Sequence, residues 1–235
     1  MGNSYFQFKQ FLVNQEHCAM KVGTDSVLLG CLTSVNAAVN CLDIGTGTGI
    51  LSLMLAQRNN ELQIDAIEID EQAFVQAKNN FSSSKFSNQI QIHLGALQNF
   101  APNKKYDLII SNPPYFIGKN NFSINDLQRA KARHDNDLPF DVLIESVLKL
   151  LNTKGKFVLI LPIAEATIFK VLANEKGLFV NNFFFIKPKP NKASNRIIIE
   201  FSMKQTVEIS EEFIVYNEDN SQTEAYKKLT EEFYL

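Results

Sequence analysis

Short apolar runs alternate with longer helical patterns along most of this chain, and this alternation most restricts the folds open to it. The apolar runs predict strands at 39–44, 63–68, 90–94, 106–111, 157–162, 179–186 and 196–203. Helical spacing predicts helices at 49–59, 71–81, 140–151 and 164–176. Strands that alternate with helices form a parallel sheet with helices on its faces. The last two strands leave no room for a crossover helix, so we expect them to pair antiparallel.

These elements predict an α/β, Rossmann-like sheet of seven strands, mostly parallel with an antiparallel last strand. We expect residues 1–235 to form a single domain. Residues 1–32 precede the first strand and are interpreted as a segment that caps the sheet edge. The tail, residues 206–235, mixes acidic and aromatic residues, which predicts one more strand and one short helix.

Composition and charge exclude several classes of protein. The formal net charge is −2, so a site for a polyanion must come from a local cluster of basic residues. The three cysteines are odd in number and lack metal-ligand spacing, which favours a reducing compartment without a disulfide framework or metal site. The first residues lack the apolar run of a signal peptide, and no stretch is long enough to cross a membrane. We therefore expect a cytoplasmic protein with no membrane association, no metal and no obligate protein partner.

The segment CLDIGTGTGILSLMLAQ joins an apolar strand to a helix through a turn that contains Gly45, Gly47 and Gly49. At such a turn, backbone amides and the positive end of the helix converge on an anionic or carboxylate group. Asp43 lies two residues before Gly45, near the end of the apolar run. We expect Asp43 and the three glycines to contact a cofactor, although a glycine-rich turn alone is also compatible with an unliganded α/β connection.

A carboxylate follows the second strand at the place where nucleotide-binding folds hold a ribose diol. Glu68 ends this strand about twenty residues after the glycine turn, as a ribose-binding carboxylate does. Asp70 is better explained as the N-cap of the next helix. Nicotinamide and adenosylmethionine sites share this arrangement, but the spacing G-x-G-x-G differs from the dinucleotide pattern G-x-G-x-x-G. The spacing therefore favours S-adenosylmethionine.

The run YDLIISNPPYF places Asn112, Pro113, Pro114 and Tyr115 just after the fourth strand, where open α/β sheets bind ligands. Two consecutive prolines stiffen the segment and leave carbonyl acceptors beside the Asn112 amide. If Asn112 and the Pro113 carbonyl accept both hydrogens of a conjugated amino group, its lone pair can point at a sulfonium methyl group. Tyr115 offers a face for stacking a planar substrate. A plain turn after a strand is the alternative interpretation.

The tetrapeptide resembles that of N-methyltransferases that act on adenine, glutamine and related amides. The segments FKQFLVNQEHCAMKVGTDSVLLG, FFFIKPKPNKASNRIIIEF and YKKLTEEFYL are similar to the tRNA1(Val) (adenine-37-N6)-methyltransferase family over nearly the whole chain. The resemblance implies an S-adenosylmethionine-dependent enzyme of the class I methyltransferase fold. Its substrate would be tRNA, at the adenine 3′ of a valine anticodon, where the base must be splayed out of its stack.

Three further cofactor contacts follow from the resemblance. Thr24 and Asp25 would cover the methionine end of the cofactor, although both could instead cap the helix that they begin. Ala96 stands where related enzymes usually carry an acidic residue that accepts from the adenine amino group. We therefore expect a backbone acceptor at this position, or apolar packing of the adenine against Leu97 and Ile69.

A basic loop connects the last two strands. Lys187, Lys189, Lys192 and Arg196 occur there without an acidic residue among them. In a slightly acidic protein, phosphate contacts should concentrate in such a loop, although a basic loop can also be merely solvated. Arg129, Lys131 and Arg133 form a second basic cluster, which we interpret as a solvated helix face.

Two other functions compete with the tRNA methyltransferase. A protein-glutamine N5-methyltransferase that acts on a release factor would use the same tetrapeptide, but it normally carries an N-terminal helical domain for which there is no room here. A catalytically silent RNA-binding protein could keep the same fold. The intact Asn112 and glycine turn argue against it, and a cofactor titration would decide.

Overall fold

The computed structural model describes residues 3–18, 20–113 and 138–235. Its main sheet has eight strands in the order β10-β8-β9-β7-β6-β3-β4-β5. Their bounds are β3 (Asn40–Ile44), β4 (Gln63–Glu68), β5 (Ile90–Leu94), β6 (Tyr106–Ser111), β7 (Leu151–Pro162), β8 (Phe179–Lys187), β9 (Arg196–Ser202) and β10 (Ile209–Ile214). Neighbouring strands run parallel except where β9 pairs with β7 and β8.

The sequence predictions for the sheet are largely confirmed. All seven predicted strands are present, and β8 and β9 pair antiparallel as their short connection requires. Two features differ. Strand β7 begins at Leu151 instead of at residue 157, and the strand predicted in the tail, β10, joins the main sheet as an eighth member, parallel to β8.

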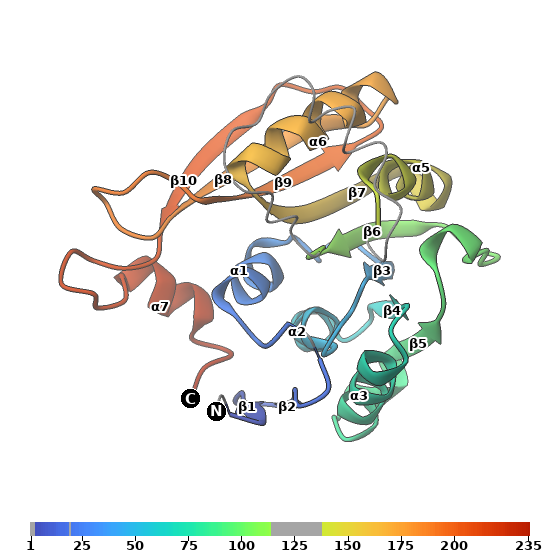
Figure 1. The fold of residues 1–235 in the computed structure, drawn as a ribbon, viewed down its shortest axis with the longest axis horizontal. Coiled ribbons are helices and arrows are strands. Elements are labelled where there is room, and N and C mark those ends of the chain that lie inside the picture. The colour runs from blue at the N-terminus through green and yellow to red at the C-terminus, as the bar shows by residue number, and fades with distance from the viewer. Residues whose placement is uncertain (1–2, 19, 114–137) are drawn as a thin grey trace.

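Helices cover both faces of the sheet (Figure 1). Figure 1 shows α1, α2 and α3 on one face and α5 and α6 on the other. The bounds are α1 (Thr24–Leu32), α2 (Ile50–Arg58), α3 (Glu71–Ser82), α5 (Phe140–Leu150), α6 (Ile163–Glu175) and α7 (Glu224–Thr230), with short 3-10 turns η1 (Ser87–Gln89) and η2 (Leu97–Asn99). Each face has its own buried apolar cluster, one including residues of α1 and α2 and the other residues of α5 and α6.

The N-terminal segment lies against the C-terminal tail. Strands β1 (Tyr5–Gln7) and β2 (Leu12–Asn14) form a separate antiparallel pair. The Lys9 amide donates to the Phe233 carbonyl at 2.8 Å. Helix α3 holds the hairpin from the other side, because the Asn80 side chain accepts from the Asn14 amide at 3.0 Å and donates to the Asn14 carbonyl at 2.8 Å. The two ends of the chain therefore support each other.

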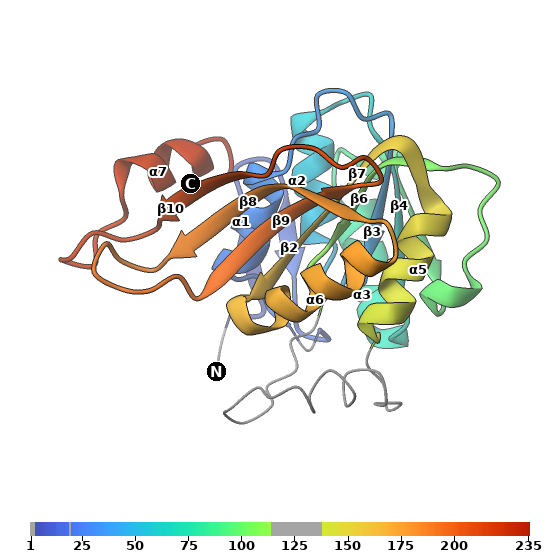
Figure 2. The same ribbon diagram turned by 90° about the horizontal axis from the view of Figure 1, so that it is seen from above.

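The order of the strands reverses between β3 and β6, which are neighbours in the sheet although two strands separate them in the chain. Ile44 and Ser111 are partners at their carboxyl ends, and Ser111 Oγ donates to the Ile44 carbonyl at 2.9 Å. Ligands of open α/β sheets bind at such a reversal. Figure 2 shows the same sheet from above. Within the described ranges, no helix is long and apolar enough to cross a membrane.

Candidate active site

Three neighbouring strands end beside one another and supply the candidate active site. The glycine turn follows β3, Glu68 ends β4 and Asn112 follows β6. The register places Ile44 opposite both Ile67 and Ser111, so these three segments leave the sheet side by side. The structure therefore brings together the main residues that the sequence predicts for the cofactor and for the reaction.

The glycine turn has a backbone that side chains rarely tolerate. Gly47 has a φ of 56°, and Gly49, the N-cap of α2, has a φ of 83°. A Cβ atom at Gly49 would lie 2.4 Å from the Phe81 ring. At Gly47 nothing lies within 4 Å of the corresponding position. Gly49 thus allows helix α2 to pack closely against α3, whereas Gly47 leaves open space beside the backbone, as a ligand requires.

The Glu68 carboxylate is buried and held by backbone amides. Its Oε2 accepts from the Gly47 amide at 2.8 Å, which links β4 to the glycine turn. Its Oε1 accepts from the Ile69 amide at 2.8 Å and from the Asp70 amide at 3.0 Å. Among the described residues, Oε2 accepts from the Gly47 amide alone, and the second lone pair of this carboxylate oxygen can accept from a ribose hydroxyl. Asp70 caps α3 as predicted, since its side chain accepts from the Ala73 amide at 2.8 Å.

Asp43 is fully buried, and hydrogen bonds from other described residues reach only one of its two carboxylate oxygens. Its Oδ2 accepts from Thr46 Oγ1 at 2.6 Å and from Ser52 Oγ at 2.7 Å. Its Oδ1 is buried without a hydrogen-bond partner among the residues that the structure describes. Burial raises the pKa of Asp43 to about 6, although the two hydroxyl donors lower it and the charge of Glu68 raises it further. An unused acceptor beside the glycine turn fits a cationic ligand group, such as the ammonium of a methionine moiety.

Asn112 is fixed by a residue that the sequence predictions did not include. Its Nδ2 donates to Ser26 Oγ on α1 at 2.8 Å. Because Nδ2 faces Ser26, Oδ1 lies on the other side of the amide, and an amide oxygen is a hydrogen-bond acceptor. Pro113 is buried at the end of the described segment. Pro114 and Tyr115 lie outside the described residues, as do Arg129, Lys131 and Arg133.

The residues predicted to pack against the cofactor adenine are apolar but differ in their exposure. Ile69 is 66% exposed directly after Glu68, which leaves an apolar side chain open to a planar ring. Leu97 is buried in the core cluster on the side of α5, so it offers less surface than predicted. Ala96 is half-buried and precedes η2, and its carbonyl accepts from the Asn99 amide at 3.0 Å.

Asp25 and Arg196, predicted for cofactor and RNA, form an ion pair with each other. Arg196 Nε donates to Asp25 Oδ2 at 2.8 Å. The N-cap of α1 is Gly23, which makes no side-chain hydrogen bond, so neither Thr24 nor Asp25 occupies the capping position. An acidic residue in the first turn still interacts favourably with the helix dipole. The pair ties the start of β9 to the start of α1, next to Ser26.

The lysines of the basic loop are less available for contacts with RNA phosphates than the sequence suggests. Lys187 pairs with Glu212 of β10 at 2.9 Å, and Lys189 donates to the Glu218 carbonyl at 3.0 Å. Lys192 is exposed and, within the described part of the chain, makes no hydrogen bond or ion pair through its side chain. These contacts arise because the tail brings acidic groups beside the loop, which spacing along the sequence does not reveal.

The residues that sequence reasoning missed are small hydroxyl residues. Ser26 orients Asn112, and Thr46 and Ser52 hold Asp43. Serine and threonine are common throughout the chain, so only their position in the fold distinguishes these three. Among the described residues, no group of three histidine, cysteine or acidic side chains could hold a metal ion.

Comparisons with known proteins agree with this geometry. The family model described as "Methyltransferase small domain" matches residues 17–137. The tRNA1(Val) (adenine(37)-N6)-methyltransferase of Bacteroides thetaiotaomicron is 41% identical, over 100% of this chain and 99% of its own length. The protein of the same name from Flavobacterium psychrophilum is 41% identical over 98% of this chain and 99% of its own. The similarity therefore extends over the whole sequence.

Solved structures share the fold at low identity. A predicted O-methyltransferase from Agrobacterium tumefaciens has a TM-score of 0.68 at 16% identity, covering 89% of this chain and 96% of its own. A putative RNA methyltransferase from Pyrococcus horikoshii has a TM-score of 0.56 at 18% identity, covering 80% and 87%. The glycopeptide N-methyltransferase MtfA in complex with S-adenosylmethionine has a TM-score of 0.58 at 12% identity, covering 82% and 100%. These likenesses concern the fold alone.

Proposed function

Since this chain belongs to the tRNA1(Val) (adenine(37)-N6)-methyltransferase family, we propose that the site at Asn112 performs that family's reaction. The enzyme transfers a methyl group from S-adenosylmethionine to the N6 amino group of adenine 37 in tRNA1(Val). The observation that carries the assignment of the site is the placement of Asn112. It follows the strand next to the glycine turn, and Ser26 fixes its amide.

The residues present fit S-adenosylmethionine. Asp43 Oδ1, which has no hydrogen-bond partner within the described ranges, would receive the ammonium group, and the open side of the glycine turn would admit the methionine chain. Glu68 Oε2 would accept from a ribose hydroxyl, and Ile69 would pack against the adenine. The cofactor supplies an electrophilic methyl group on a sulfonium, and the protein positions the acceptor nitrogen against it.

Asn112 and Pro113 act on the substrate amine. The adenine N6 nitrogen is a weak nucleophile because its lone pair is delocalised into the ring. Asn112 Oδ1 and the Pro113 carbonyl would accept its two hydrogens and draw the nitrogen toward tetrahedral geometry. The Ser26 hydrogen bond fixes the orientation of the Asn112 amide. We include Pro114 and Tyr115 in this site on the basis of the sequence.

The tRNA is proposed to contact the basic loop at Lys192, with Lys187, Lys189 and Arg196 contributing after their internal pairs open. Breaking these internal contacts costs free energy, so we expect the three residues to contribute less to the RNA-binding energy than Lys192 does. We also propose that the enzyme works in the cytoplasm, because Cys18, Cys31 and Cys41 are buried free thiols. Free buried thiols are typical of reducing compartments.

A single experiment tests the function and separates it from the alternatives. Total tRNA from a strain that lacks this activity is incubated with the enzyme and labelled S-adenosylmethionine, and the labelled nucleoside is mapped. We expect N6-methyladenosine at position 37 of tRNA1(Val). Methylation of a release factor in place of tRNA would point to the glutamine enzyme. Cofactor binding that is absent in calorimetry would point to a silent RNA-binding protein.

A further inference from the structure

A cavity of about 390 Å³ lies where the N-terminal hairpin, the start of α1 and the C-terminal tail meet. Figure 1 shows these three segments on the same side of the molecule. The lining is mostly aromatic and amide in character, and it includes Phe6, Gln7, Tyr216, Gln222, Tyr226 and Tyr234. The cavity thus combines flat ring surfaces with amide groups that can donate and accept.

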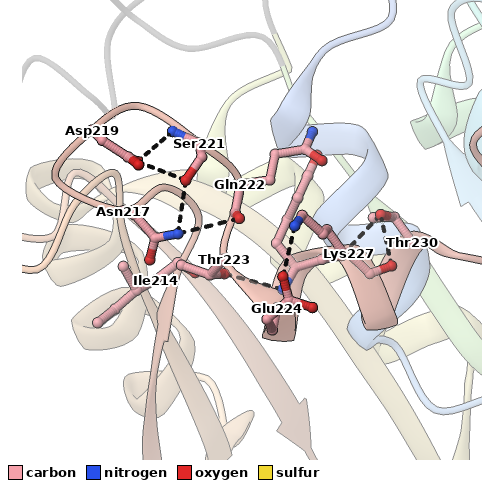
Figure 3. A network of polar contacts seen from close by, with 10 residues as sticks. Ile214, Asn217, Asp219, Ser221, Gln222, Thr223, Glu224, Lys227 and Thr230 are labelled. Carbon is pink, nitrogen blue, oxygen red and sulfur yellow. Dashed lines mark hydrogen bonds and ion pairs between the residues drawn. The ribbon is translucent and has the colours of Figure 1, made fainter.

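The turn between β10 and α7 holds two of these side chains in place. Tyr216 and Gln222 form an antiparallel bridge, so their side chains share one face. The Asn217 amide donates to the Ser221 carbonyl at 2.8 Å, and Asp219 Oδ1 accepts from the Ser221 amide at 2.9 Å. Figure 3 shows this network of the turn. The relative position of Tyr216 and Gln222 is therefore set before any ligand binds.

Several polar groups of the cavity have unused hydrogen-bonding capacity. In Figure 3 the side-chain amide of Gln222 points away from the turn, and the backbone carbonyl of Gln222 accepts from Asn217 Nδ2 at 3.3 Å. Within the described residues, neither the Gln222 amide nor the Tyr216 hydroxyl has a hydrogen-bond partner. Tyr226 and Tyr234 share one bond between their hydroxyls at 3.1 Å, which leaves one O–H hydrogen to donate.

Helix α1 connects the cavity with the reaction site. Thr24 contributes to the wall of the cavity and is the first residue of α1. Two residues later, Ser26 binds Asn112. Thr24 and Ser26 belong to the same helical turn, but their side chains point to different sides of α1, so the helix lies between the cavity and Asn112.

We propose that this cavity binds an unpaired base of the anticodon loop other than the methylated adenine, stacked on Tyr216 and hydrogen-bonded by Gln222. The inference rests on the proposed function, because it concerns the same RNA. Unpaired bases stack on aromatic side chains and are read at their edges by amides. A second base held in this cavity keeps the loop splayed, and the target adenine is then free to reach Asn112.

The test measures binding of a fluorescent anticodon stem-loop in the presence of S-adenosylhomocysteine. Tyr216→Leu keeps apolar volume but removes the ring, and we expect it to weaken RNA binding about 5- to 100-fold. Gln222→Ala should weaken it about 3- to 10-fold, since the backbone bonds of the turn remain. The controls Tyr5→Leu and Gln91→Ala change exposed residues outside the cavity and should bind as the wild type does.

Stem-loops with one abasic nucleotide identify the base. At one loop position other than the target, removing the base should weaken wild-type binding, and Tyr216→Leu should then add nothing further. Two results would overturn the proposal that the cavity binds a base, provided that the wild type still methylates the intact stem-loop. One is wild-type RNA affinity in both Tyr216→Leu and Gln222→Ala. The other is a loss of affinity from Tyr216→Leu that adds to the loss from the abasic nucleotide at every loop position. If the wild type methylates neither the stem-loop nor full-length tRNA, the proposed function fails, and this inference fails with it.

Discussion

At the scale of single residues, Asn112 is held by a residue distant in the sequence, whereas Asp43 is held by residues near it in the sequence. Asn112 is only half-buried, and its amide takes its orientation from Ser26, 86 positions away in the sequence. Asp43 is locked by two adjacent hydroxyls, with one oxygen left without a partner within the described structure. In the proposed function, Asn112 contacts the substrate and Asp43 contacts the cofactor.

Ser26→Ala should slow methyl transfer about 3- to 10-fold while cofactor affinity stays unchanged, because the amide of Asn112 loses the bond that orients it. Asn112→Ala should reduce the rate by a factor of about 100 or more. Single-turnover rates and calorimetric titration with S-adenosylmethionine separate the two effects. Ser26→Thr keeps the hydroxyl and should restore most of the rate. A wild-type rate in Ser26→Ala would show that Asn112 needs no external orientation.

The raised pKa of Asp43 predicts opposite pH dependences for cofactor binding and stability. Affinity for S-adenosylmethionine should fall as the pH falls through about 6, because the ionised carboxylate is lost. Stability should instead fall as the pH rises from about 4 to 6, because the folded protein binds the proton more tightly than the unfolded chain does.

Asp43→Asn tests both expectations about Asp43. It should remove the pH dependence of binding between pH 5 and 7, at a lower affinity throughout. Near pH 7 its free energy of unfolding should be on the order of 2–3 kcal/mol higher than that of the wild type. Near pH 3 this difference should disappear, because Asp43 is then protonated in both the folded and the unfolded state. Urea unfolding at several pH values checks the stability. Equal stability of the two proteins at pH 7 would mean that the buried charge of Asp43 does not destabilise the folded protein.

At the scale of elements, the turn before α2 and the loop after β8 show how neighbouring segments limit a local pattern. The glycine turn works because α3 approaches so closely that Gly49 has no room for a side chain. The basic loop is partly neutralised because β10 lies beside β8. Both effects come from contacts between elements.

Gly49→Ala should destabilise the protein by about 2–4 kcal/mol, because the left-handed backbone and the close contact with Phe81 add up. Gly45→Ala is the matched control. Gly45 also has a positive φ, of 67°, but nothing lies within 4 Å of its added methyl group. It should cost only about 1–2 kcal/mol. Urea denaturation without cofactor compares the two, and equal losses would show that Phe81 moves aside.

Lys192→Ala should lower the slope of log RNA affinity against log salt by about 0.7–0.9, the value for one phosphate contact. Lys187→Ala should change the slope less, since Lys187 is already paired with Glu212. Titrations of the stem-loop at several salt concentrations measure both slopes, and binding of S-adenosylmethionine serves as the control. If Lys192→Ala keeps the wild-type slope, the loop is merely solvated and the phosphate contacts lie elsewhere.

At the scale of the whole molecule, the two ends of the chain close one face of the protein. Tyr226 and Phe233 of the tail belong to the same buried cluster as Phe8 of the N-terminal segment and residues of α1 and α2. Strand β10 extends the sheet that carries the active site. We propose on this basis that residues 1–235 act as one domain, with the tail as an integral part.

Phe233→Ala should lower the free energy of unfolding by about 3–5 kcal/mol, the usual cost of removing a buried aromatic ring. Phe233 is 2% exposed, whereas Leu235, two residues later, is 85% exposed. Leu235→Ala should therefore change stability by about 0.5 kcal/mol or less. Chemical denaturation followed by circular dichroism compares the two variants. A stable Phe233→Ala protein would mean that the tail is dispensable for the fold.

The sequence alone predicted the seven strands from β3 to β9 and the strand ends at the site. Period and turn chemistry are local, so they predicted β4, β5 and β6 within their observed bounds, the cap at Asp70 and the antiparallel pairing of β8 with β9. The order of parallel strands then places the glycine turn, Glu68 and Asn112 together, because each follows a neighbouring strand at the same edge.

Only the tertiary structure decided which side chains meet. The bond between Ser26 and Asn112 and the ion pair between Asp25 and Arg196 join residues 86 and 171 positions apart. The place of β10 beside β8 pairs Lys187 with Glu212, and the meeting of the chain ends creates the aromatic cavity. A polar side chain in one sequence carries no signal for a partner so distant, because the contact depends on how whole elements pack and not on the residues around it.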